Sequence, residues 1–119
     1  ALRVWQKVSE AVSGVGLVIV GSGGEEKKLK NLARKLNLEK TVIFEPWTNE
    51  LSSCYRTSDI FLLTSFFEGY GMTLIEAHTL GCPIVSSDVG IAPELSNTTV
   101  CPVNDANCFE QALVNQLTK

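Results

Sequence analysis

The chain has 119 residues, of which 45% are hydrophobic and 19% are charged, and its net charge at pH 7 is −3. This length and apolar content predict one packed domain. The weak negative charge argues against nucleic-acid binding, no apolar run reaches the ~18 residues of a membrane span, and no basic-then-apolar signal segment opens the chain.

The first half of the chain alternates amphipathic segments with short apolar runs. In chain order we expect a helical segment at the N-terminus, a strand at Leu17–Val20, a helix at Glu25–Leu36, a strand at Thr41–Phe44 and a short helix at Leu51–Thr57. In the second of these helices the leucines lie at helical spacing, and Lys27, Lys28 and Lys30 are expected to form a solvated face.

The second half continues the alternation. We expect a strand at Ile60–Leu63, a helix at Met72–Leu80, a strand at Pro83–Ser86, a helical turn at Pro93–Ser96, a brief strand at Thr99–Cys101 and a final helix at Ala106–Leu117. The helix at Met72–Leu80 ends where Gly81 and Pro83 interrupt it.

The alternation predicts an α/β fold with a Rossmann-like, doubly wound parallel sheet. The strands are apolar runs rather than alternating patterns, which is typical of strands covered on both faces. Ligands of such sheets bind outside the carboxyl ends of the strands. The glycine-containing turns at 21–24 and 68–71, together with Gly90, are expected at that edge, so three segments should form one site.

The four cysteines are Cys54, Cys82, Cys101 and Cys108. They form no CxxC pair and are accompanied by a single histidine, His78, which argues against a zinc site. We expect reduced, mostly buried thiols in a cytoplasmic protein, and a Cys101–Cys108 bridge is the less favoured alternative.

Residues 65–77 carry the strongest chemical signal. Two glycines, Gly69 and Gly71, lie in a turn between an expected strand and an expected helix. The free N–H groups at a helix start and the helix dipole favour an anion at such a turn. Two carboxylates near it, Glu68 and Glu76, can accept hydrogen bonds from ligand hydroxyls, as the acidic residue of a dinucleotide fold does.

This stretch resembles the signature of the retaining, family 4 type of glycosyltransferases (glycosyl transferases group 1) with the GT-B fold. That signature has two glutamates separated by seven residues and is usually written around Glu-Gly-Phe-Gly; here it reads Glu68-Gly69-Tyr70-Gly71 and ends at Glu76. Residues 77–88 resemble the family's helix, Gly-x-Pro turn and next strand. Residues 89–95 resemble its Gly-Gly-x-x-Glu element, and segments 17–23 and 42–47 match two further strands and their loops.

The resemblance implies that residues 1–119 are the C-terminal, donor-binding domain of a GT-B enzyme. Such an enzyme transfers a sugar, with retention, from a UDP-, GDP- or ADP-sugar to a hydroxyl acceptor. The acceptor, a sugar or a lipid-linked sugar, would be bound by an N-terminal domain, which leaves open a peripheral membrane association of the parent protein. No cofactor or metal is expected, because helix N-termini and a basic pair would stabilise the charge of the leaving group.

The resemblance also implies roles for the two carboxylates. Glu68 would be the catalytic residue, accepting hydrogen bonds from hydroxyls of the transferred sugar, and Glu76 would contact the nucleotide ribose. The structural alternatives are a helix-dipole residue for Glu68 and a solvated helix-face residue for Glu76. The apolar neighbours Leu74, Ile75 and Ala77 argue against a freely solvated Glu76.

The remaining implied site residues bind the donor through backbone or rim contacts. Gly69, Tyr70, Gly71, Met72 and Thr73 would offer backbone N–H groups to the diphosphate, Gly21 and Gly23 would line the nucleotide side, Trp47 would border the base, and Gly90 would face the sugar and phosphates. The alternative is that the glycines only turn the chain and that Trp47 only packs. Ile91 replaces the second glycine of the family's Gly-Gly element.

One departure concerns the basic pair. The family carries an Arg and a Lys after the first strand of this domain, and Arg3 and Lys7 do not fit their spacing. We therefore expect the chain to begin after that pair and to be inactive by itself.

Two other functions remain open from the residues alone. One is a sugar-nucleotide epimerase, which shares the GT-B architecture, and the other is a non-catalytic binding module on a Rossmann-like scaffold. A receiver domain is disfavoured, because no acidic cluster ends the first strand.

Overall fold

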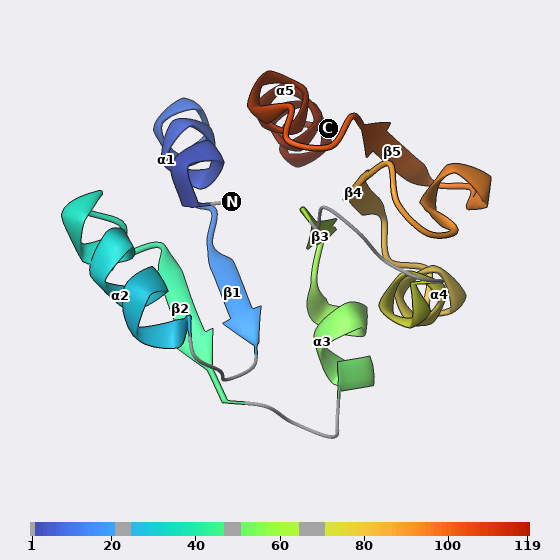
Figure 1. Ribbon diagram of the computed structural model, residues 1–119, viewed down its shortest axis with the longest axis horizontal. Helices are drawn as coiled ribbons and strands as arrows, with labels where there is room; N and C mark the ends of the chain where they lie inside the picture. The colour runs from blue at the N-terminus through green and yellow to red at the C-terminus, as the bar shows by residue number, and fades with distance from the viewer. Residues whose placement is uncertain (1, 21–24, 47–50, 65–70) are drawn as a thin grey trace. The chain divides into compact units, whose positions relative to one another are not determined.

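The computed structural model describes residues 2–20, 25–46, 51–64 and 71–119 (Figure 1). The chain divides into two compact units, Ala1–Asn49 and Glu50–Lys119. In each unit parallel strands are connected through helices, so the predicted α/β class is confirmed.

The first unit contains a two-stranded parallel sheet. Its elements are α1 (Leu2–Ala11), β1 (Leu17–Val20), α2 (Glu26–Lys35) and β2 (Val42–Glu45). Helix α1 buries Leu2, Trp5 and Val8, which recur every three residues along one face. The indole Nε1 of Trp5 donates to Oγ1 of Thr41 at 3.2 Å, which ties α1 to the residue that precedes β2.

One face of this sheet is exposed, contrary to the prediction from its apolar strands. Val18 and Ile43 are paired in register and are 53% and 54% exposed. Successive side chains of a strand point to opposite faces, so an apolar run alone does not establish that a second layer covers both. The cover on both faces that the apolar runs predict is therefore not present at Val18 and Ile43 within the described part of the first unit.

The solvated face predicted for α2 is confirmed. Lys27, Lys28 and Lys30 are exposed. Lys30 Nζ lies 2.9 Å from Oε1 of Glu26 one turn earlier, an arrangement that contributes about 0.3–0.5 kcal/mol.

The second unit contains a three-stranded parallel sheet in the order β3-β4-β5. Its elements are α3 (Leu51–Thr57), β3 (Phe61–Leu63), α4 (Met72–Thr79), β4 (Ile84–Ser87), a 3-10 turn η1 (Ala92–Glu94), β5 (Thr98–Cys101) and α5 (Ala106–Leu117). The central strand β4 is buried at all four positions, which comprise the apolar Ile84 and Val85 and the polar Ser86 and Ser87. Each predicted element of this half is present, with ends within two residues of the prediction.

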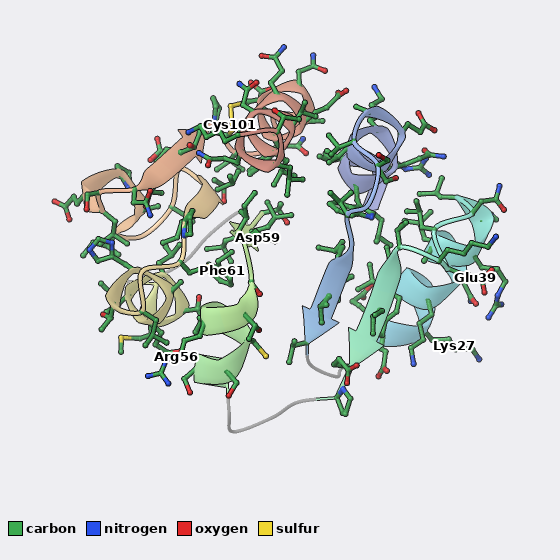
Figure 2. All side chains as sticks on the ribbon, turned by 180° about the vertical axis from the view of Figure 1, so that it is seen from behind. Lys27, Glu39, Arg56, Asp59, Phe61 and Cys101 are labelled. Atoms are coloured by element: carbon green, nitrogen blue, oxygen red, sulfur yellow. A yellow bond between two sulfur atoms is a disulfide. The ribbon has the colours of Figure 1, made fainter. Side chains whose placement is uncertain are left out.

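In the core of this unit, side chains of α3 and α4 pack against the sheet. Its buried members are Tyr55, Leu74, Ala77, Cys82, Ile84 and Ala92. Phe61, labelled at the start of β3 in Figure 2, packs against this core. Leu74 and Ala77 are fully buried, so α4 presents one residue per turn to the core.

Helix α4 begins at a glycine that no other residue can replace without strain. Gly71 has φ 93° and ψ 59°, in the left-handed region, and its carbonyl accepts from the N–H groups of Leu74 at 3.0 Å and Ile75 at 3.2 Å. A Cβ at Gly71 would lie 2.8 Å from Cδ1 of Leu74. Gly71 is therefore required both by backbone conformation and by the packing of α4.

A disulfide joins Cys101, the last residue of β5, to Cys108 in the first turn of α5. The prediction that these thiols are reduced is wrong. Asp105 caps α5 by accepting from the Cys108 N–H at 3.1 Å, and the tight connection brings the two Cα atoms within 5.7 Å, a distance that a disulfide spans. Figure 2 labels Cys101 at this junction. Cys54 and Cys82 are free thiols, and Cys82 is buried.

Gly71→Ala should lower the free energy of unfolding by about 2–3 kcal/mol, because it adds a steric conflict with a fully buried leucine to the cost of a left-handed alanine. Gly81→Ala is the matched control: Gly81 also has a positive φ, 76°, but a Cβ there meets nothing within 4 Å. The control should lose only about 1 kcal/mol. Urea unfolding of both variants measures the difference, and equal losses would contradict the Leu74 contact.

Cys108→Ala should lower the free energy of unfolding by about 2 kcal/mol under non-reducing conditions, because it opens the loop closed by a bond between residues seven apart. Cys54→Ala, at a half-buried free thiol in a helix, is the control and should change it by less than about 1 kcal/mol. Urea unfolding with and without dithiothreitol checks this prediction. A Cys108→Ala effect that persists unchanged in reductant would show that the bond contributes nothing.

Candidate functional site: the start of helix α4

The candidate site lies at the carboxyl edge of the three-stranded sheet. Strand β3 ends at Leu63 before α4, and β4 ends at Ser87 shortly before Gly90. Because β3 and β4 are parallel, both exits lie at the same edge. Two of the three segments that the sequence predicts at this edge, the start of α4 and the turn at Gly90, thus follow neighbouring strands that end there.

The start of α4 is open to solvent. Met72, its first residue, is 63% exposed, Thr73 is half-buried, and Gly71 before them is buried. The Gly71 carbonyl accepts from Leu74 and Ile75, whereas the N–H groups of Met72 and Thr73 have no acceptor within the helix, and Gly71 has no side chain to cap them. Together with the helix dipole, these groups favour a phosphate at this end of α4.

Glu76 lies in the second turn of α4, as predicted. The residue is exposed while Leu74 and Ala77 are buried, so its apolar neighbours do not bury it. The carboxylate is not freely solvated, however. Its Oε2 accepts a hydrogen bond from the hydroxyl of Tyr55 on α3 at 3.4 Å.

Tyr55 is a residue that the sequence analysis missed. Its side chain is 6% exposed, and its ring meets the ring of Phe61 edge to face, with centroids 5.4 Å apart and planes at 86°. Desolvation by burial, followed by the charge and the hydrogen bond of Glu76, raises the pKa of Tyr55 to about 12. The hydroxyl therefore stays protonated at neutral pH and can only donate toward the carboxylate.

No spacing rule in the sequence connects Tyr55 with Glu76, which is 21 residues later. The pairing follows from the contact between α3 and α4, a tertiary feature. The one signal that the sequence offered was a tyrosine in an expected short helix, and that signal does not separate a core aromatic from a site residue.

The other expected site residues divide into two groups. Gly90 lies in an exposed turn with φ 52°, which suits a glycine. The described ranges exclude Gly21, Gly23, Trp47, Glu68, Gly69 and Tyr70, so the predictions on these six lie outside the described residues. Ile91, which replaces the second glycine of the Gly-Gly element, packs against the core that contains Leu74 and Ala77. This substitution therefore has a packing role.

Two further findings concern other kinds of site. Within the described ranges, no group of three or more histidine, cysteine, aspartate or glutamate residues is arranged to hold a metal ion. None of the helices in those ranges is long and apolar enough to cross a membrane.

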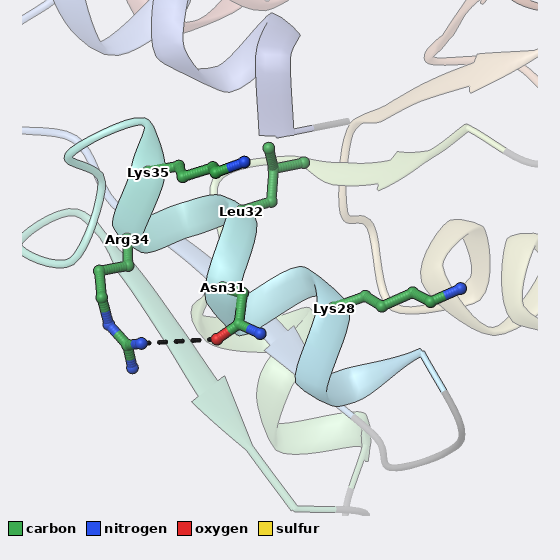
Figure 3. A pocket seen from close by; sticks show the side chains of 5 residues that line it. All are labelled: Lys28, Asn31, Leu32, Arg34 and Lys35. Carbon is green, nitrogen blue, oxygen red and sulfur yellow. Dashed lines mark hydrogen bonds between the residues drawn. The ribbon is translucent and has the colours of Figure 1, made fainter.

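An open depression of about 550 Å³ lies on α2 in the first unit, lined by Lys28, Asn31, Leu32, Arg34 and Lys35 (Figure 3). Nη1 of Arg34 donates to Oδ1 of Asn31 at 3.4 Å within it. None of the donor-site residues that the structure describes lines this depression, and the lining residues in the described ranges all come from α2.

Several proteins resemble the chain in sequence. An uncharacterized glycosyltransferase of Haemophilus influenzae is 46% identical over 85 residues, which cover 71% of this chain and 24% of that protein. The UDP-Gal:alpha-D-GlcNAc-diphosphoundecaprenol alpha-1,3-galactosyltransferase of Escherichia coli is 30% identical over 102 residues, which cover 82% of this chain and 26% of that protein. The chain thus spans about a quarter of the length of these curated relatives.

Solved structures share the fold. WaaG, a glycosyltransferase involved in lipopolysaccharide biosynthesis, matches 99% of this chain and 34% of its own, with a TM-score of 0.86 and 25% identity. A variant of Staphylococcus aureus TarM, solved with fondaparinux, alpha-GlcNAc-glycerol and UDP, matches 99% of this chain and 25% of its own, with a TM-score of 0.94 and 22% identity. These likenesses confirm the GT-B type of α/β fold.

The family model of glycosyl transferases group 1 matches residues 1–118, nearly the whole chain. It agrees with the order of strands and helices and with the resemblance of residues 68–76 to the family signature. The chain therefore belongs to the glycosyl transferases group 1 family.

Proposed function

We propose that the chain is the donor-binding part of a larger glycosyltransferase that transfers a sugar, with retention, from a nucleotide-diphospho-sugar to a hydroxyl acceptor. One observation carries the proposal: α4 begins at the left-handed Gly71 at the carboxyl edge of the sheet and carries the exposed carboxylate of Glu76 in its second turn. Membership of the family supports the reaction class.

The diphosphate of the donor would bind at the start of α4. The N–H groups of Met72 and Thr73 are in the first turn of the helix, and their partial positive charge complements a diphosphate without a metal ion. The turn at Gly90, which leaves the neighbouring strand at the same edge, would border the sugar and the phosphates.

Glu76 would accept hydrogen bonds from the ribose. Side chains of a helix lean toward its N-terminus, so a carboxylate in the second turn can reach a ligand bound over the first. Glu68 would orient the transferred sugar. Charge stabilisation of the leaving nucleoside diphosphate by the helix start would then supply a large part of the catalysis.

The donor would be a UDP-, GDP- or ADP-sugar. The name of the Escherichia coli relative specifies UDP-Gal, and the TarM variant was solved with UDP, which supports UDP first. The acceptor would be a sugar or a lipid-linked sugar, as the diphosphoundecaprenol in that relative's name suggests. We place the enzyme in the cytoplasm, with a peripheral attachment to the membrane.

Glu76→Ala should weaken binding of the free nucleoside diphosphate by about 10- to 100-fold, since hydrogen bonds to a charged acceptor contribute roughly 1.5–3 kcal/mol. Calorimetric titration of the full-length protein with UDP, GDP and ADP measures this effect. Glu110→Ala, which removes a glutamate from helix α5, is the matched control and should leave the affinity unchanged. Unchanged affinity in Glu76→Ala would make this carboxylate structural.

Glu68→Gln should lower kcat about tenfold or more in the full-length protein, because it removes the charge that orients the sugar. Binding of the free nucleoside diphosphate should stay within about twofold, since that ligand carries no transferred sugar. Kinetics with radiolabelled donor sugar and calorimetry with the free nucleotide separate the two effects. Wild-type turnover would leave Glu68 as a helix-dipole residue, and product analysis of the anomeric configuration tests retention.

A further inference from the structure

We infer that Tyr55 is a positioning residue for the donor: its hydroxyl holds Oε2 of Glu76 so that Oε1 is presented to the ribose hydroxyls of a nucleoside diphosphate. The inference rests on the ribose-binding role proposed for Glu76. It goes beyond that role because it assigns the two carboxylate oxygens different partners and adds a residue from another helix to the site.

The first step is that the ring of Tyr55 has a fixed place. Its side chain belongs to the buried core of the second unit, and its ring is held edge to face by Phe61 at 5.4 Å. A ring packed in this way has little freedom, so its hydroxyl marks a defined point at the contact between α3 and α4.

The second step concerns Glu76, whose side chain is exposed and flexible where that of Tyr55 is buried and fixed. Its carboxylate is exposed and is attached through a flexible side chain, so without a partner it would sample several rotamers. The hydroxyl of Tyr55 donates to Oε2 at 3.4 Å, which is long for such a bond. The bond therefore adds little to stability, and its effect is to favour the rotamers in which Oε2 faces α3.

The third step is the direction of donation. Burial and the charge of Glu76 raise the pKa of Tyr55 to about 12, so at neutral pH the hydroxyl carries its proton and donates. An ionised carboxylate has about four acceptor positions on two oxygens. With Oε2 directed to Tyr55, Oε1 remains for donors from a ligand, and neighbouring ribose hydroxyls supply two of them.

The packing alone does not need the hydroxyl. A phenylalanine at position 55 would fill the same space in the core and keep the contact with Phe61. Within the described part of the chain, Tyr55→Phe therefore removes only the proposed orienting hydrogen bond, so the substitution tests the role of the hydroxyl separately from that of the ring.

The experiment measures, by calorimetry, the dissociation constants of the full-length protein for UDP and for 2′,3′-dideoxy-UDP. If GDP or ADP binds more tightly than UDP, that nucleotide and its dideoxy analogue are used instead. Four proteins are compared: the unmodified protein, Tyr55→Phe, Glu76→Ala and the double variant. Thr57→Val is the matched control, because it removes another hydroxyl from α3, one that donates to the Ser53 carbonyl at 2.8 Å within the helix. Thermal unfolding of each variant confirms that it is folded.

We expect Tyr55→Phe to weaken UDP binding about three- to tenfold and to leave the dideoxy analogue unaffected. This loss is smaller than that of a direct hydrogen bond to a charged group, because Tyr55 acts only by orienting Glu76 through a long bond. In the Glu76→Ala background, Tyr55→Phe should have no further effect, because the group it orients is gone. Thr57→Val should bind both ligands like the unmodified protein. If Tyr55 had a purely structural role, Tyr55→Phe would change the affinities for UDP and for its dideoxy analogue equally.

Three results would overturn the inference. If Glu76→Ala weakens UDP binding and Tyr55→Phe does not, Tyr55 has no positioning role although the proposed function stands. If Tyr55→Phe weakens both ligands equally, or weakens UDP equally with and without Glu76, it acts through packing. If Glu76→Ala changes nothing, the ribose role of Glu76 and the inference fail together.

Discussion

The contact between Leu74 and the backbone of Gly71 is the constraint on which the site depends. Leu74 is fully buried in the core of the second unit, and it lies so close to Gly71 that no Cβ fits between them. This contact packs the first turn of α4 against the core next to Gly71, the residue at which the helix begins and whose carbonyl accepts its first backbone hydrogen bonds. Core packing thereby sets the spacing along α4 between the proposed phosphate site at its start and the carboxylate of Glu76.

Much of the fold could be predicted, because patterns within a few neighbouring residues determine most of its strands and helices. Strand β1, helix α3 and helix α5 have the predicted bounds, since apolar runs, helical spacing and the cap at Asp105 all act over a few residues. The position of Glu76 in the second turn of α4 followed in the same way from the glycine turn before it. These features need no knowledge of which segments meet.

The features that could not be predicted all depend on tertiary contacts. The disulfide of Cys101 and Cys108 depends on the geometry of one tight strand-to-helix connection. The number and spacing of the cysteines do not reveal that geometry. The exposure of Val18 and Ile43 depends on the absence of cover over one sheet face within the described residues. Tyr55 lies next to Glu76 because α3 packs against α4, and no residue near it in the sequence predicts this pairing.

The buried indole of Trp5 has a spectroscopic consequence. The chain contains two tryptophans, Trp5 and Trp47, and both precede the boundary between the compact units at residues 49 and 50. Trp5 is 3% exposed and hydrogen-bonded to Thr41, so its emission should be shifted to short wavelengths while the first unit is folded. Tryptophan fluorescence therefore follows the first unit, and the tyrosine absorption of Tyr55 follows the second, which allows the two units to be observed separately in one unfolding experiment.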